Sequence, residues 1–312
     1  MRKELVVLDN YAKLKDINHF LAENYRKSVK QNKPALPFDL KKIKLTNKKN
    51  SCYDKNHKPK GNLGKMIGVE IECYLPRAAF VSKDSYDYAD LEDYDFCIKV
   101  AKLFDIFNMK GVSVTEDSSL YGSSTTFGVE IQVLFPIHTP EPLMKVLEIL
   151  NTFKATVDKD CGLHVHVDLR NKINLKDRKK VIPKVEKTLG ILGSLVAPYR
   201  CDGEYSSIYN SSFSSSKDSA LYYNEYLKTL EYRVHQGVLD YNQIISWVNL
   251  CYQITHCKQL EKAMAPTSLG ELFEYLNLDN KNKNVLKKKY SQTRADRLIR
   301  KLMKHKEEDD IK

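Results

Sequence analysis

Four stretches of this 312-residue chain place ionisable side chains at every second position of an apolar pattern. Side chains alternate between the two faces of a β-strand, so every second residue lies on the same face. In each stretch one expected face is apolar, and the other carries carboxylates, imidazoles or a guanidinium. The four stretches are MIGVEIECYL (66–75), TFGVEIQVLF (126–135), CGLHVHVDL (161–169) and TLEYRVHQ (229–236).

The polar faces of these stretches suit a site for divalent metal ions and phosphate. Mg²⁺ prefers oxygen ligands and commonly bridges protein carboxylates and substrate phosphates. A guanidinium binds two phosphate oxygens at once through its planar fork. A strand face that only meets water more often carries Thr, Lys and Ser. The candidate residues are Glu70, Glu72, Glu130, Gln132, His164, His166, Asp168, Glu231, Arg233 and His235.

These strands, and the helices expected between them, predict an α+β fold. Because each strand has one polar face, we expect an antiparallel sheet with helices packed on its apolar face and the site on the other face. A Lys- and Asn-rich linker is expected over 40–62 and a Ser-rich loop over 203–220. Apolar spacing and helix-start residues predict helices over 11–30, 94–110, 140–154, 184–197 and 240 to about 264, and a charged helical C-terminal end.

Charge divides the chain into an acidic middle and two basic ends. Residues 1–65 carry 17 Lys and Arg against 6 Asp and Glu, residues 281–312 carry 12 against 5, and residues 66–280 carry 22 against 29. The basic ends are expected to be solvated tails, or to recruit an acidic polymer or a partner protein. The expected domains are a basic N-terminal helix and linker over 1–64, a catalytic domain over 65–265 and a charged helical C-terminal extension over 266–312.

The composition favours a cytoplasmic protein without a membrane partner. No apolar run is long enough to cross a bilayer, and no signal-peptide apolar region follows the first four residues. The seven cysteines are an odd number and include no Cys-x-x-Cys pair, so we expect free thiols in a reducing compartment.

Several of these motifs resemble the amidoligase family, the carboxylate–amine ligases related to glutamine synthetase and glutamate–cysteine ligase. GVEIE, TEDSSL followed by GVEI and Pro136, CGLHVHVD, and TLEYRVHQG followed by Asp240 stand in the family's order over residues 65–255. The resemblance implies a curved antiparallel, glutamine-synthetase-like sheet that forms half of a funnel. It also implies that ATP, with two or three Mg²⁺ or Mn²⁺ ions, phosphorylates a carboxylate before an amine displaces the phosphate.

The resemblance implies a role for each matching residue. Arg233 is expected to bind the transferred phosphate, His166 to lie near it, and Glu72 to face the nucleotide as well as a metal. Asp117, or Glu116 beside it, is expected to bind metal or the incoming amine. The metal ligands implied by the matching positions are Glu70, Glu72, Glu130, His164 and Glu231.

Two regions depart from the family pattern. The family usually has Ser-Pro soon after the second-strand Glu, whereas this chain has Gln132 followed by three apolar residues and Pro136. It often has an Arg near an Asn upstream of the late Glu, whereas this chain offers Lys217 and Asn224. Arg200 is a further catalytic candidate, as a contact for substrate or phosphate.

We therefore expect an ATP-dependent ligase that forms an amide or isopeptide bond through an acyl phosphate. Its substrates are expected to be a carboxylate and an amine, from an amino acid, a peptide or a polymer end. The chain has no GxxxxGK[ST] sequence, so ATP is expected on the metal-lined sheet rather than at a helix N-terminus.

Other classes stay open at this point. A zinc hydrolase could use the His-x-His-x-Asp of HVHVD, although the excess of Glu over His favours Mg²⁺. A nucleic-acid-binding protein could use the basic ends, but that class leaves the acidic strand faces unexplained. Each pattern alone also suits a solvated Glu pair, a buried hydrogen-bonded His or a salt bridge between Glu231 and Arg233.

Overall fold

The computed structural model describes residues 65–80, 92–107, 109, 111–170, 180–201 and 219–310. The predicted helix over 11–30, the linker over 40–62, Lys217 and most of the predicted loop over 203–220 lie outside these residues. The described chain divides into two compact units: unit 1 holds residues 66–162 and 237–241, and unit 2 holds residues 163–236 and 242–310. The predicted domain boundaries after residues 64 and 265 stay predictions.

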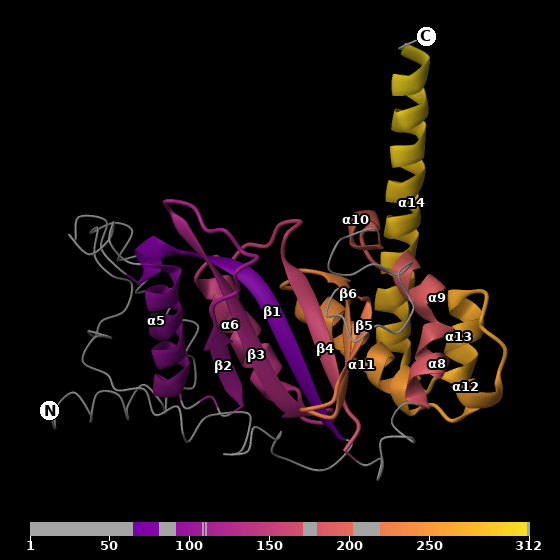
Figure 1. Ribbon diagram of the computed structural model, residues 1–312, viewed down its shortest axis with the longest axis horizontal. Coiled ribbons are helices and arrows are strands. Elements are labelled where there is room, and N and C mark those ends of the chain that lie inside the picture. Colours follow the sequence, from indigo (N-terminus) through magenta and orange to yellow (C-terminus); the bar gives the residue numbers. More distant parts are fainter. Residues whose placement is uncertain are drawn as a thin grey trace, which may run out of the picture. The chain divides into compact units, whose positions relative to one another are not determined.

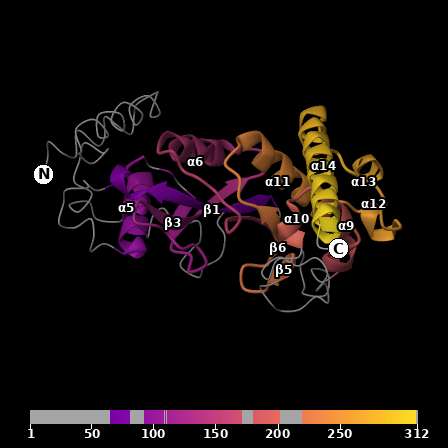
Figure 2. The same cartoon turned by 90° about the horizontal axis from the view of Figure 1, so that it is seen from above.

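Unit 1 combines an antiparallel sheet with two α-helices. Strand β3 pairs with both β1 and β2, which gives the order β2-β3-β1. Helix α6 lies against one face of β3 and β1 (Figures 1 and 2). The elements are β1 Met66–Pro76, the 3₁₀-helix η2 Arg77–Ala79, α5 Asp93–Ile106, β2 Val112–Thr115, β3 Thr126–Pro136 and α6 Glu141–Thr152.

The predicted alternation in the first two stretches is confirmed by burial. The residues predicted to face inward on β1 and β3 are buried, whereas Glu70, Glu130 and Gln132 on the opposite face are half-buried. Glu72 is the exception on that face, because it is buried too. The apolar side chains of α6 are buried as well. Pro142 fits the first turn of α6, because the N–H that proline lacks has no partner there in any helix.

The predicted helix over 94–110 ends earlier than expected, at Ile106. The chain then turns into β2 through Gly111, whose φ is +82°. A Cβ atom at this position would lie 2.5 Å from the Leu134 carbonyl oxygen. Both the positive φ and this close approach require glycine, so Gly111 belongs to the turn before β2 rather than to the helix end.

Unit 2 combines strands in the order β4-β6-β5 with a set of helices. Strands β5 and β6 pair in antiparallel fashion, and the Leu169 N–H after β4 donates to the Lys228 carbonyl before β6 at 2.9 Å. Helix α14 is the longest element and extends beyond the other helices of this unit (Figure 1). The elements are β4 Gly162–Asp168, α8 Val181–Glu186, α9 Leu189–Ser194, α10 Pro198–Cys201, β5 Leu221–Asn224, β6 Thr229–Gln236, α11 Tyr241–His256, α12 Gln259–Lys262, α13 Leu269–Tyr275 and α14 Asn280–Asp310.

Helix α11 packs on the apolar face of β6. The Tyr232 hydroxyl lies 2.7 Å from Thr255 Oγ1 and 3.2 Å from the Cys251 carbonyl, so the strand and the helix share buried hydrogen bonds. Ile244, Val248 and Cys251 are all buried, which confirms the predicted inward face of this helix.

Two predicted helices differ from the observed ones. The helix predicted over 184–197 begins at Val181 and is broken into α8 and α9 at Thr188, whose hydroxyl donates to the Val185 carbonyl at 2.7 Å. The helix predicted to reach about residue 264 ends at His256. Buried Lys184 donates to the Thr255 and Cys257 carbonyls at 2.7 and 3.1 Å. These bonds provide partners for carbonyl groups that have none within the helix at the C-terminal end of α11.

The described residues confirm the predicted α+β class and the antiparallel pairing of strands. Two short strands, β2 and β5, were not predicted. None of the described helices combines the length and the apolar character needed to cross a membrane.

Candidate functional site

The register of unit 1 sets the predicted carboxylates beside one another. Glu72 is directly opposite Glu130, and Glu70 is directly opposite Gln132. Residues in direct register on antiparallel strands have Cβ atoms about 5 Å apart. The sheet therefore brings three of the predicted metal ligands, Glu70, Glu72 and Glu130, onto one face.

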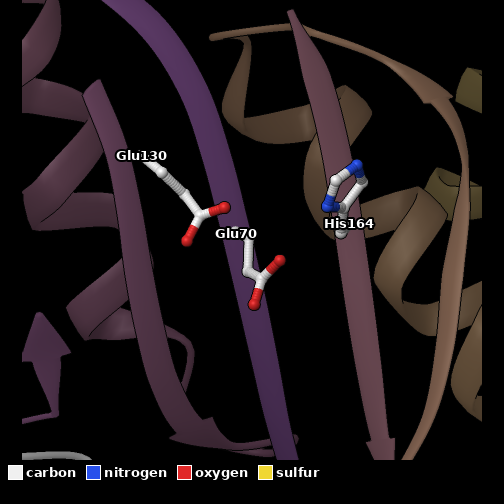
Figure 3. Close-up of side chains that lie close together, drawn as sticks. All are labelled: Glu70, Glu130 and His164. Carbon is white, nitrogen blue, oxygen red and sulfur yellow. The ribbon is translucent and has the colours of Figure 1, made fainter. Parts of the chain in front are cut away.

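Side-chain hydrogen bonds hold this face in place. Gln132 Nε2 donates to Glu130 Oε1 at 2.8 Å and to Glu70 Oε1 at 3.5 Å. Ser113 and Thr115, from the unpredicted strand β2, donate to Gln132 Oε1 and Glu130 Oε1, each at 3.1 Å. Figure 3 shows Glu130 on β3 extending toward Glu70 on β1, and it also labels His164 on β4. Gln132, which departs from the family pattern, thus ties the two carboxylates together.

A group of three carboxylates in unit 1 has the donors of a cation site. One oxygen each of Glu72, Asp117 and Glu130 lie within 4.8 Å of one another. Glu72 is only 4% exposed, and its Oε2 accepts the Gly162 N–H at 2.6 Å. Carboxylate oxygens are the ligands that Mg²⁺ and Ca²⁺ prefer, and a cation would remove the mutual repulsion of the three charges.

Of the two acidic residues left open by the sequence, the structure places Asp117 in this group. The Asp117 carboxylate accepts the Ser119 N–H at 2.7 Å, which fixes its direction at the start of the loop after β2. Glu116 is exposed and belongs to none of the acidic groups found among the described residues.

Unit 2 builds its polar face around Glu231. This side chain is 3% exposed and stands on β6. Its Oε1 lies 3.7 Å from His164 Nδ1, its Oε2 lies 3.7 Å from His166 Nε2, and it forms an ion pair with Arg233. His164 and His166 are also buried, at 5% and 6% exposure. Four predicted site residues of β4 and β6 therefore meet in one buried cluster.

Two residues of this face were not predicted as site residues. Thr229 Oγ1 lies 3.1 Å from His166 Nδ1 and so orients the ring whose other nitrogen approaches Glu231. Thr229 stands two residues before Glu231, so the same alternation could have placed it on the face. Tyr222 on β5 is directly opposite Glu231 and half-buried. Its strand is only four residues long, too short to show a pattern.

Arg200 and Asp168 have partners that bear on their predicted roles. Arg200 Nη2 donates to the backbone carbonyl of Arg233 at 2.8 Å, so it supports the strand that carries the candidate phosphate ligand. Its contact with substrate stays a prediction. Asp168 is 1% exposed and binds Arg170 through both carboxylate oxygens, each at 2.8 Å.

The described cysteines are poor candidates for nucleophiles. All six are free, and five of them are buried. Burial raises the pKa of the Cys97 and Cys161 thiols to about 12 and raises the pKa of Cys73 further. A thiolate is the reactive form, so these thiols stay protonated at neutral pH and serve as packing groups.

His235, near the end of β6, is held neutral. Burial lowers its pKa from the ordinary value of 6.5 to about 3, and the positive charges of Lys289 and Arg200 act in the same direction. The hydrogen bond that His235 Nδ1 donates to the Gln236 carbonyl, 2.7 Å long, opposes this shift only in part. Its ring lies 4.8 Å from that of Trp247 on α11.

We expect His235 to make unfolding strongly dependent on pH below neutrality. Because the folded pKa lies below the unfolded one, its contribution is complete above about pH 6.5 and is lost as the pH falls toward 3. Each pH unit in this window costs about 1.4 kcal/mol of unfolding free energy, so wild type should lose about 2 kcal/mol from this group between pH 6.5 and pH 5. Urea unfolding at both pH values measures the loss.

A matched pair of variants isolates this effect. His235→Asn keeps a side-chain N–H donor but does not titrate, so its unfolding free energy should vary about 2 kcal/mol less over the same pH range. His138 is exposed, and His138→Asn should retain the wild-type dependence. Equal slopes for His235→Asn and wild type would show that the acid sensitivity comes from other groups.

No family model matches this chain, and no curated protein sequence matches it.

Proposed function

We propose that this protein is an ATP-dependent carboxylate–amine ligase that forms an amide or isopeptide bond through an acyl phosphate, as the resemblance to the amidoligase family implies. The buried polar cluster around Glu231 supports this proposal more than any other feature. Glu231, at 3% exposure, lies among two buried imidazoles and a guanidinium. Burying several ionisable groups together is costly even when they pair with one another, and a role in cation and phosphate binding gives a reason for this cost.

The proposal assigns cation binding to the carboxylate faces of both units. Glu70, Glu72 and Glu130 in unit 1, and His164 and Glu231 in unit 2, would bind the two or three Mg²⁺ or Mn²⁺ ions. The oxygen-rich donors of unit 1 fit Mg²⁺. Bound there, Mg²⁺ would neutralise the phosphates of ATP and shield their negative charge from an incoming carboxylate. The convergence of all five side chains on one centre stays a prediction.

The proposed reaction has two steps. A substrate carboxylate oxygen attacks the γ-phosphorus of ATP, the bond to the β-phosphate oxygen breaks, and ADP leaves with that electron pair. The amine nitrogen then attacks the acyl carbon, phosphate leaves with the electrons of the C–O bond, and the amine loses a proton. Arg233 would stabilise charge on the transferring group, where catalysis depends mainly on positioning and electrostatics.

The remaining polar residues would orient this chemistry. Thr229 fixes the ring direction of His166, which the proposal puts near the transferred phosphate. Arg200 holds the Arg233 backbone. Together with Glu72 and Glu130, Asp117 would bind a cation or the positively charged form of the amine.

The zinc-hydrolase alternative is weakened by one contact. A zinc site at HVHVD would need a third ligand, either Asp168 or another residue, beside the two histidines. Both oxygens of Asp168 are bound by the Arg170 guanidinium in a bidentate pair, which competes directly with a metal. A nucleic-acid-binding protein would still leave the buried cluster around Glu231 without a purpose.

The reaction type can be tested before either substrate is identified. Purified protein with ATP and Mg²⁺ should release phosphate when suitable pools of carboxylic acids and amines are both present, and chromatography should show ADP as the nucleotide product. The control omits the acids, and phosphate release should then fall to background. AMP and pyrophosphate as products would mean adenylation of the carboxylate and would contradict the acyl-phosphate route.

A further inference from the structure

Asp117 is the one carboxylate of its acidic group that does not stand on a strand. Glu72 and Glu130 are fixed opposite each other by the register of β1 and β3. Asp117 instead lies near the start of the loop over 116–125, which joins β2 to β3. Its distance from the other two carboxylates therefore depends on whatever holds this loop against the sheet.

The middle of the loop is anchored by Leu120. This side chain is 4% exposed and packs with Tyr74 and Cys161, and its N–H donates to the Asp117 carbonyl at 3.1 Å. Gly128 on β3 makes room for it, because a Cβ atom there would lie 2.5 Å from Leu120 Cβ. These contacts hold the middle of the loop, but they do not hold the end of the loop that leads into β3.

Arg77 supplies the second fixed region. Its Nε–H points at the carbonyls of Ser123 and Thr126, each 3.2 Å away, and its backbone N–H donates to the Thr125 carbonyl at 2.9 Å. Three carbonyls at the far end of the loop are thus held by one residue. The Ser123 hydroxyl lies 2.9 Å from Thr126 Oγ1 and stiffens the same turn.

The Arg77 guanidinium is itself held from the other side. Its Nη2 forms an ion pair with Asp93 at the start of α5, and its guanidinium carbon lies 4.8 Å from the centre of the Phe96 ring. The second Asp93 oxygen accepts the Gly128 N–H at 3.4 Å. The guanidinium therefore links a helix to the end of the loop, and a lysine has no planar fork that could make both sets of contacts.

We propose that Arg77 is a positioning residue for the cation centre: it holds the loop over 116–125 so that Asp117 stays within reach of the ion bound by Glu72 and Glu130. This inference rests on the proposed function, because it requires that the acidic group of unit 1 bind a divalent ion. Side chains that orient metal ligands without touching the metal commonly change metal affinity about 10- to 100-fold when removed.

The test is Mn²⁺ binding to the full chain, followed by the electron paramagnetic resonance signal of free Mn²⁺. Arg77→Ala should weaken binding about tenfold, and Arg77→Lys should lose less because it keeps the charge pair with Asp93. If Arg77 acts through Asp117, then in an Asp117→Asn background the Arg77→Ala change should cause no further loss.

A stability control separates positioning from general loosening. Val146 is fully buried in α6, so Val146→Ala should lower the melting temperature while leaving Mn²⁺ affinity unchanged. Unchanged Mn²⁺ affinity in Arg77→Ala, or additive losses of affinity in the double variant, would overturn the positioning role of Arg77. The proposed cation centre would not be affected by either result. If wild type binds no Mn²⁺, or if Asp117→Asn binds it as tightly as wild type, the proposed cation centre is overturned and this inference with it.

Discussion

Arg233→Lys should lower the rate of ATP consumption by roughly 10- to 1,000-fold, the range typical of losing a preorganised charge contact in a transition state. Lysine keeps the positive charge and can still pair with Glu231, but it cannot grip two phosphate oxygens at once. The affinity for ATP should fall less, since the metal ions that the proposal assigns to the phosphates would still hold the nucleotide. The rate of ADP release and the ATP dissociation constant, measured on one purified variant, check both statements.

The same substitution should leave stability nearly unchanged. Lysine keeps a positive charge beside the buried Glu231 carboxylate, so the ion pair can persist and we expect the melting temperature to stay within about 3 °C of wild type. Arg170→Lys is a matched control, because Arg170 also pairs with a buried carboxylate of unit 2 and is 10% exposed. That control should keep normal turnover. A stable Arg233→Lys protein with full activity would refute the assigned role.

The long strands could be predicted because one face of each packs in the apolar core. Residues such as Val69, Ile131 and Val165 are completely buried, so every second position of these strands needs an apolar side chain. This requirement makes the alternation visible in the sequence. The polar residues between them then necessarily share the other face. The periodicity therefore indicates which residues share the polar face of each strand.

Short and interrupted elements could not be predicted in this way. Strands β2 and β5 have four residues each, which is the lower limit for a readable alternation. The break between α8 and α9 follows from a single hydroxyl, that of Thr188, bonding backwards to the chain. The early end of α11 follows from Lys184, which lies 71 residues before Thr255 in the sequence. Such long-range partners leave no local pattern.

The supporting contacts of the candidate site were also beyond prediction from sequence. Arg77 and Asp93 lie 16 residues apart, and Arg200 meets the Arg233 backbone from 33 residues away. Neither arginine stands in an alternating stretch. The sequence therefore indicates well the residues that share a strand face with a buried core, and it hides the residues that hold this face in place.

Glu231→Gln should reduce stabilisation by divalent cations and abolish most of the turnover. At a free Mn²⁺ concentration 100 times the dissociation constant, a bound ion stabilises the folded protein by about 2.7 kcal/mol. Wild type should therefore melt several degrees higher with Mn²⁺ than with a chelator. Glutamine keeps the shape of the side chain but removes the charge that a metal ligand provides, so the variant should show a smaller rise than wild type. Scanning calorimetry with and without Mn²⁺ measures the difference.

The competing interpretation, in which Glu231 only pairs with Arg233 inside unit 2, makes a different prediction. Without any cation, removing one partner of a buried ion pair should destabilise the protein by about 3 kcal/mol or more, and the response to Mn²⁺ should match that of wild type. Glu261→Gln is the matched control, because Glu261 is half-exposed and its distance to Lys184 Nζ is 3.8 Å; it should keep both stability and the Mn²⁺ response. A Glu231→Gln protein that is strongly destabilised yet still fully stabilised by Mn²⁺ would assign Glu231 to packing and exclude it from the cation centre.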